Sequence, residues 1–364
     1  MPNSFFRIKM LPARYGDSLW IEYGMGGDVS RLMIDGGPVD TFEHIQENLS
    51  SVPMGERSFE LIVLTHVDAD HVEGLVRLFA ESPLPFAVNQ VWFNGWRQME
   101  KAHGLLGPLQ GEFLSALLVD RVPRAWDQNA PPWVVPNQGK LPTSDLPGGM
   151  KLTLLSPSPE GIDKMARAWR PAIEKAGISP GDLDAAWKAL AEQKKFLPKK
   201  GLLGAAPSLD TLLKKQFVKD QAIPNGSSIA FLAEYAGKSA LFLADAHPDL
   251  VAASIGRLCR ERGVKSLEVS AVKVAHHGSK HNTSASLLKL ISSPSYLIST
   301  NGDKFQHPDK ECIARILKFG HPKQMYFNYQ SRFTKPWLAK SAQDKYHYVT
   351  VVRDEKAVSL NVEL

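Results

Sequence analysis

Residues 61–75 read LIVLTHVDADHVEGL, and this stretch decides the fold of the chain. The apolar, partly β-branched residues 61–64 predict a buried strand, and an amphipathic helix is expected to begin near residue 71. Four polar side chains fall within six positions at the junction of the two elements: His66, Asp68, Asp70 and His71. One tight turn between strand and helix therefore holds two imidazoles and two carboxylates.

This group of side chains is best interpreted as part of a metal site. Imidazole and carboxylate groups are the usual protein ligands of Zn²⁺ and its neighbours in the first transition row. In the alternative interpretation the aspartates cap the helix, since Asp is a favoured N-cap residue. A cap accounts for one aspartate and for neither histidine, so the metal interpretation explains more of the pattern.

The composition describes an ordinary globular protein. The chain has 364 residues, of which 43% are hydrophobic and 22% charged, and no apolar run approaches the roughly 20 residues of a membrane span. The first residues lack the apolar core of a signal peptide, so a cytoplasmic location without a membrane partner is expected. Cys259 and Cys312 are too few for a CxxC zinc site, and a disulfide is not expected in that compartment.

The formal net charge is +5 and the sequence pI is about 9.0. This mildly basic balance is compatible with a polyanionic substrate but does not require one.

The order of predicted elements favours a single α/β domain over residues 1–364. Strand-like segments dominate both ends of the chain, with helices between them, and two sheets faced by helices would account for this pattern. The expected architecture is thus a four-layer αββα sandwich. Residues 95–221 are rich in Pro, Gly, Trp and Lys and contain short helical pieces, interrupted by one strand-like piece at 150–157. Most of this segment is predicted to be a helical insertion, or cap, on the core fold.

Other strand ends should complete the metal site, because Zn²⁺ binds about four ligands. Asp245 follows the apolar strand of ALFLADAH, and His276 and His277 follow that of AVKVAHHGS. His307 lies in a loop after a third predicted strand. Each could be a solvated loop residue, but their recurrence at successive strand ends favours a shared site.

These motifs resemble the metallo-β-lactamase fold superfamily, and within it the ComEC-like branch. The segments that carry the resemblance lie at both ends of the chain and leave most of 95–221 unmatched: YGDS (15–18), LMIDGGP (32–38), LTHVDADHVEGL (64–75), NGSSIAFL (225–232), LFLADA (241–246), VAHHGSKHNTS (274–284) and STNGDKFQHP (299–308). The resemblance implies an αββα sandwich and metal-dependent hydrolysis.

The resemblance also implies a role for each matching residue. Asp35 would orient the ligand turn, His66 and Asp68 would bind a first metal, Asp70 and His71 would bind a second, and Asp245 would bridge both. One of His276 and His277 would be a further ligand of the second metal; the sequence does not choose between them, and the other would act on substrate or behind the ligands.

The chain departs from the commoner superfamily pattern, HxHxDH, in two ways. Asp68 stands where that pattern has a histidine, so Mn²⁺ or Mg²⁺ becomes plausible beside Zn²⁺. A third-motif histidine is also missing, because His103 is the sole histidine between His71 and Asp245 and its context is helical rather than a strand end. One or two divalent ions are therefore expected.

The leading hypothesis is a phosphodiesterase, specifically a DNase. Catalysis should depend on Asp70, and His307, His281 or the non-ligating member of the 276/277 pair could protonate the leaving oxygen. Asn225 either lines the pocket or simply forms a turn. Lysines in a basic stretch could bind a DNA backbone or form a solvated face: Lys194, Lys195, Lys199 and Lys200.

Two other classes stay open. One is a hydrolase of small phosphodiesters, lactones or other esters, since fold does not fix function. The other is a non-catalytic metal-binding effector module that acts with a protein partner.

Overall fold

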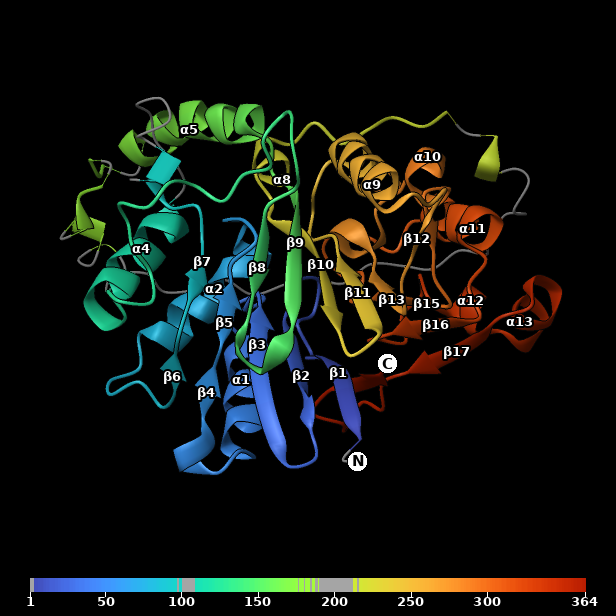
Figure 1. Ribbon diagram of the computed structural model, residues 1–364, viewed down its shortest axis with the longest axis horizontal. Coiled ribbons are helices and arrows are strands. Elements are labelled where there is room, and N and C mark those ends of the chain that lie inside the picture. The colour runs from blue at the N-terminus through green and yellow to red at the C-terminus, as the bar shows by residue number, and fades with distance from the viewer. Residues whose placement is uncertain are drawn as a thin grey trace.

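The computed structural model describes residues 3–96, 98–99, 109–175, 177–179, 181–183, 185–186, 189, 212–214 and 216–364. These residues form two large sheets that lie face to face (Figure 1). The smaller sheet has the order β18-β1-β2-β3-β5-β7. Its strands are β1 (Ser4–Met10), β2 (Leu19–Met25), β3 (Asp28–Ile34), β5 (Leu61–Val63), β7 (Val91–Trp92) and β18 (Leu360–Glu363).

The larger sheet has the order β17-β16-β15-β13-β11-β10-β9-β8. Its strands are β8 (Thr143–Asp145), β9 (Lys151–Ser156), β10 (Ala230–Tyr235), β11 (Lys238–Phe242), β13 (Ala271–Lys273), β15 (Ser295–Ile298), β16 (Gln324–Phe327) and β17 (Val349–Val352). Two short parallel pairs accompany the large sheets: β4 (Ser58–Phe59) with β6 (Ala87–Val88), and β12 (Leu267–Glu268) with β14 (Ile291–Ser292).

Central strands of the smaller sheet such as β2 and β5 are buried on both faces, and apolar residues occupy both positions of their two-residue repeat. In β5, Leu61 and Val63 join the core between the two sheets, whereas Ile62 packs in the core beneath the helices. In β2, Ile21 lies in the core between the sheets and Trp20 in the core beneath the helices. A continuous apolar run such as 61–64 is the sequence signature of such a strand.

Helices cover the outer faces and complete the four layers. The helical core of the smaller sheet draws on α1 (Thr41–Ser50), α2 (Ala69–Phe79), α4 (Leu109–Arg121) and α5 (Pro159–Glu174). The larger sheet packs against α9 (Pro248–Arg262), α10 (Ala285–Leu288) and α11 (Lys310–Arg315). Shorter helices are α8 (Ile223–Gly226), α12 (Lys335–Leu338) and α13 (Lys340–Tyr346). The predicted αββα sandwich is confirmed.

Helix α2 begins at Ala69, two residues before the predicted start near residue 71, so Asp70 and His71 lie in its first turn. The segment 267–273 is divided into β12 and β13. Helix α10 ends at Leu288, and Ile291 pairs with Leu267 between β14 and β12.

The segment 95–221 contributes to the sandwich itself. Strand β9 pairs antiparallel with β10, and β8 pairs with β9 at the edge of the larger sheet. Helices α4 and α5 of the same segment pack in the helical core of the smaller sheet. Within the described part of the chain, none of the helices has the length and apolar character needed to cross a membrane.

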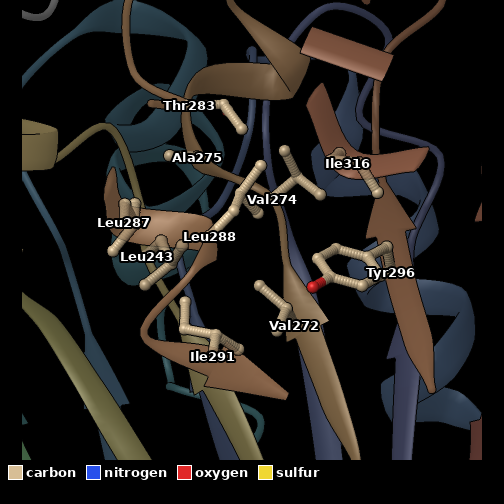
Figure 2. A pocket seen from close by; sticks show the side chains of 10 residues that line it. All are labelled: Leu243, Val272, Val274, Ala275, Thr283, Leu287, Leu288, Ile291, Tyr296 and Ile316. Atoms are coloured by element: carbon tan, nitrogen blue, oxygen red, sulfur yellow. The ribbon is translucent and has the colours of Figure 1, made fainter. Parts of the chain in front are cut away.

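One internal cavity lies between the larger sheet and its covering helices (Figure 2). Its volume is about 10 Å³, the size of a single water, and its walls are almost entirely hydrocarbon. The lining residues are Leu243, Val272, Val274, Ala275, Thr283, Leu287, Leu288, Ile291, Tyr296 and Ile316. This cavity is a small packing void and has no room for a substrate.

Candidate metal centre

The carboxylate of Asp245 lies among four imidazoles. Asp245 follows β11 and is 2% exposed. The distances from its Oδ2 atom to Nε2 atoms are 3.8 Å (His66), 3.5 Å (His71), 3.6 Å (His276) and 3.9 Å (His277). Two pairs of parallel strands end beside Asp245, namely β3–β5 in the smaller sheet and β11–β13 in the larger sheet. The sandwich therefore gathers the ends of four strands around one carboxylate.

Asp35 fixes the orientation of His71. Its Oδ2 atom accepts hydrogen bonds from His71 Nδ1 at 2.8 Å and from Thr65 Oγ1 at 2.7 Å. Its Oδ1 atom accepts one from the Thr65 backbone N–H at 2.8 Å. With Nδ1 donating to Asp35, Nε2 keeps the lone pair that a metal would need. Burial acts to lower the pKa of His71, but Asp245 and Asp35 outweigh it and hold that pKa well above its ordinary value.

A buried ion pair lies behind His277. The Nδ1 atom of His277 faces Asp17 Oδ1 at 3.3 Å, and Asp17 Oδ2 accepts a hydrogen bond from Lys273 Nζ at 2.5 Å. Burial would raise the pKa of Asp17, but Lys273 and His277 hold it well below its usual range. Burial would lower the pKa of His277, yet the Asp17 and Asp245 carboxylates raise it to about 9. Asp17 thus orients His277 much as Asp35 orients His71.

Asp220 and two asparagines surround Nδ1 of His276. Asp220 Oδ2 lies 3.4 Å away, Asn282 Oδ1 3.0 Å and Asn225 Nδ2 3.3 Å. Asp220 in turn accepts hydrogen bonds from Asn225 Nδ2 at 2.6 Å and from Asn282 Nδ2 at 2.9 Å. Burial would raise the pKa of Asp220, but the hydrogen bonds from His276 and Asn225 keep it well below its usual value. The His276 side chain is 21% exposed, so it forms the solvent side of the cluster.

The two aspartates of the 61–75 turn have different surroundings. Asp70 is buried in the first turn of α2, and its Oδ2 atom lies 3.4 Å from His277 Nε2. Burial acts to raise the pKa of Asp70, but His277 and His71 lower it to about 2. Asp68 occupies the N-cap position without a side-chain capping bond, so the capping interpretation does not explain it. Its side chain is 41% exposed, with Oδ2 3.6 Å from His66 Nε2.

The donor set fits divalent metal ions. Two groups of side chains place potential ligand atoms within 4.8 Å of one another, namely His66 with His71 and Asp245, and Asp70 with His71 and His277. Among the described residues, four atoms of these groups are buried without a hydrogen-bond partner: His66 Nε2, His71 Nε2, His277 Nε2 and Asp245 Oδ1. Unsatisfied buried polar atoms are costly, and bound divalent cations would give these four atoms partners.

Of the remaining predicted site residues, His307 lies beside His276, whereas the His281 imidazole is held elsewhere. The His307 ring centroid lies 5.5 Å from that of His276, and Asp309 Oδ2 lies 3.4 Å from His307 Nδ1. Burial lowers the pKa of His307 even though Asp309 opposes that effect. The Nδ1 atom of His281 donates to the carbonyl of Val218 at 2.6 Å. The His281 carbonyl accepts a hydrogen bond from the Asp220 backbone N–H at 3.1 Å, but within the described residues no side-chain contact joins the His281 imidazole to the metal ligands. Lys194, Lys195, Lys199, Lys200 and His103 lie outside the described residues.

Three charged residues of the centre have no role in the sequence-based assignment. Asp17 lies in YGDS, one of the segments that carry the family resemblance, and Lys273 has the pattern of an ordinary strand residue. Asp220 is the last residue but one of the predicted insertion, 95–221. Among these, only the Asp17 motif offered a usable signal.

A groove of about 620 Å³ borders the centre at Asp220. Its other charged or ionisable lining residues are Glu160, Lys164, Lys219, His247 and Asp249. Lys219 is paired with Asp249 at 2.7 Å. The groove is therefore neither a deep apolar pocket nor a basic channel, and it does not discriminate between small and polymeric substrates.

Comparisons with known proteins add little to this geometry. No family model matches the chain, and no curated protein matches it either. CmlA, a diiron β-hydroxylase from Streptomyces venezuelae, is similar over 100% of this chain and 54% of its own, with 12% identity and a TM-score of 0.37. The chain thus spans about half the length of that protein.

Two further solved structures are similar at the same level. They are a diphosphatase from the PhnP family (15% identity, 97% of this chain and 87% of that one, TM-score 0.34) and Zn²⁺-bound PqqB from Methylobacterium extorquens (13% identity, 96% and 87%, TM-score 0.36). The fold assignment rests on the sheet order and the packing of the helices. The protein is an αββα sandwich whose strand ends gather a histidine–aspartate cluster with the composition of a divalent-metal centre.

Proposed function

We propose that this protein is a metal-dependent hydrolase that cleaves phosphodiester bonds, with DNA as its substrate. The observation that carries the proposal is the convergence of four imidazole Nε2 atoms on Asp245, with several of these atoms buried and unpaired. The resemblance of the ligand motifs to the ComEC-like branch supports the choice of a nuclease. The mildly basic chain agrees with a polyanionic substrate.

We assign the ligands to two ions by the contacts of the two turn aspartates, since Asp70 lies beside His277 and Asp68 beside His66. Asp70, His71, Asp245 and His277 would hold one ion, and His66, Asp68, Asp245 and His276 would hold the other. In this assignment His276 takes the ligand position that the third-motif histidine, missing from this chain, would occupy. When bound, divalent ions activate water for attack and neutralise charge on the phosphate.

The protein's own side chains would orient the ligands and handle the proton of the leaving group. Asp35, Asp17 and Asp220 each face an Nδ1 atom, which aims the corresponding Nε2 atom at the centre. His307 is the best-placed candidate for the proton donor, because it is next to His276 and because Asp309 beside its Nδ1 atom opposes the burial that lowers its pKa. His281 is the weaker candidate, since its Nδ1 atom is held by the Val218 carbonyl.

The test compares hydrolysis of plasmid DNA and of bis(p-nitrophenyl) phosphate, with Mn²⁺, with Zn²⁺ or with EDTA. Wild-type protein should hydrolyse both substrates with metal and neither with EDTA. Asp70→Ala should lose at least about a hundredfold in rate because a ligand is removed. Asp344→Ala removes an exposed carboxylate paired with Lys340 and should leave the rate unchanged.

Each alternative predicts a different result. Intact DNA with every metal, together with turnover of the small diester, would contradict the nuclease assignment. Tight metal binding without turnover of either substrate would favour a non-catalytic module. Full activity and metal content in Asp70→Ala would show that the site is assigned wrongly.

A further inference from the structure

An exposed aromatic side chain lies at the edge of the metal centre. Phe305 is 38% exposed, which is unusual for a phenylalanine, and it belongs to the loop between β15 and α11. Its ring centroid lies 6.2 Å from that of His307, with the rings inclined by 26°, and 6.5 Å from that of His276. A flat apolar surface therefore adjoins an imidazole that faces Asp245.

Tyr15 and Lys304 extend this surface. The rings of Tyr15 and Phe305 meet edge to face, with centroids 5.9 Å apart and an interplanar angle of 82°. The Lys304 Nζ atom lies 4.7 Å from the Tyr15 ring centroid and 4.8 Å from that of Phe305. Within the part of the chain that the structure describes, Lys304 forms no ion pair with a carboxylate, so its charge is available to an anion.

The loop that carries Lys304 and Phe305 is tied to the loop that carries Tyr15. The backbone N–H of Asn301 donates to the Arg14 carbonyl at 2.7 Å. The Asn301 side chain donates to Asp303 Oδ2 at 2.8 Å, and the Gln306 N–H donates to the Gly302 carbonyl at 3.0 Å. These hydrogen bonds hold the backbones of the two loops next to each other, and so bring Tyr15 near Lys304 and Phe305.

The chemistry of these three side chains matches a nucleotide unit. A base stacks on an aromatic face whatever its identity, and an ammonium group beside that face attracts the adjoining phosphate. In duplex DNA the base faces are already stacked on one another, so this aromatic surface can stack only on an unpaired base. A nucleotide fits this surface better than an apolar peptide, because an apolar side chain would make no favourable contact with the Lys304 ammonium group.

We propose that Tyr15, Lys304 and Phe305 form a subsite that stacks an unpaired nucleobase of single-stranded DNA and binds its neighbouring phosphate beside the metal ligands. This inference rests on the proposed function and narrows its substrate from DNA in general to single strands. Phe305 supplies the stacking face, Tyr15 supports it from the edge, and Lys304 binds the phosphate.

The test uses two oligonucleotides of equal length, one of thymidine and one of abasic tetrahydrofuran residues. The two have the same phosphates, and only one has bases. Wild-type protein with Mn²⁺ should cleave the thymidine strand with a KM about tenfold lower, the usual effect of one stacked base. Phe305→Ala should remove this difference by raising KM for the thymidine strand alone. Lys304→Gln should raise KM for both strands, and Phe305→Trp should preserve the wild-type ratio.

Two matched variants serve as controls. Met54→Ala removes an apolar side chain that is 82% exposed, and Lys238→Gln removes the exposed lysine that begins β11. Neither should change KM for either strand. Binding of both strands, followed by fluorescence anisotropy with the same variants and metal, gives a readout that does not need turnover.

The outcomes separate this inference from the proposed function. Equal affinity of wild-type protein for the two strands, or an unchanged ratio in Phe305→Ala, would overturn the subsite. If both strands are still cleaved when the subsite is overturned in this way, the phosphodiesterase assignment stands. If neither strand nor plasmid is cleaved with any metal, the proposed function fails, and the anisotropy ratio alone decides the subsite.

Discussion

Asp220 Oδ2 lies 3.4 Å from His276 Nδ1, while Nε2 of the same imidazole points at Asp245 from 3.6 Å. This arrangement repeats on His71 and His277, where Asp35 and Asp17 take the place of Asp220. A carboxylate behind a ligating histidine fixes the ring and strengthens the ligand. Three imidazoles of the centre are thus held by three aspartates from three separate parts of the chain.

The substitution Asp220→Asn is expected to weaken metal binding by about tenfold to a hundredfold, which is the usual cost of removing such a partner. The amide lacks the negative charge that favours His276 as a donor to Asp220. A competition titration against a chromophoric chelator measures the affinity. Asp249→Asn is the matched control, because Asp249 lines the same groove and is paired with Lys219 away from the ligands. Equal affinity in the two variants would mean that Asp220 does not position His276.

The part of the centre that could be predicted from sequence is the part with local signals. His66, Asp70 and His71 are close together between a buried strand and an amphipathic helix. Asp245 follows an apolar strand, and the ends of parallel strands meet at one edge, whereas the role of Asp35 comes from the family resemblance. These signals need only the period of each element and the rule that polar residues gather at strand ends.

The rest depends on how the two sheets pack. Asp17 and Lys273 are 256 residues apart, one in the β1–β2 loop of the smaller sheet and the other at the end of β13 in the larger sheet, so nothing local pairs them. The sequence does not choose between His276 and His277. In the structure both have a left-handed backbone, with φ of 47° and 53°, and both Nε2 atoms face Asp245. Non-glycine residues rarely adopt that conformation, and sequence patterns do not reveal it.

The substitutions Asp245→Asn and Asp68→Asn should affect metal content differently. Asp245 faces all four imidazoles, so its loss is expected to remove both ions. Asp68 contacts His66 alone among these histidines, so its loss should remove one ion at most. Metal content after dialysis, measured by mass spectrometry, checks this difference. Equal metal loss in both variants would contradict the division of the centre into two sites.

Breaking the buried ion pair should destabilise the fold. Lys273→Met leaves the Asp17 carboxylate buried without its ammonium partner, and the free energy of unfolding should fall by about 3–5 kcal/mol. The double variant Asp17→Asn/Lys273→Met removes the stranded charge and should recover part of that loss. Urea denaturation of both proteins in EDTA measures the change. Lys340→Met, which breaks an exposed pair with Asp344, should have little effect.

Protonation of the ligand histidines should compete with metal binding. Without metal, Asp17 and Asp245 raise the pKa of His277 to about 9 from an ordinary value of 6.5, so the protonated ring stabilises the fold. That contribution is fully present below pH 6.5 and is lost as the pH rises through about 9. In EDTA, the free energy of unfolding should therefore decline across this interval, as urea titrations at several pH values would show.

Metal binding should reverse this trend, because a metal needs the neutral ring and must displace its proton. The apparent affinity should rise by about tenfold per pH unit for each proton displaced, until the pH reaches about 9. His71, whose pKa is also raised, would add a second proton. Calorimetry in buffers with different heats of ionisation counts the protons released at pH 7. Binding without proton release would show that His277 and His71 are already neutral in the metal-free protein, or that neither one is a ligand.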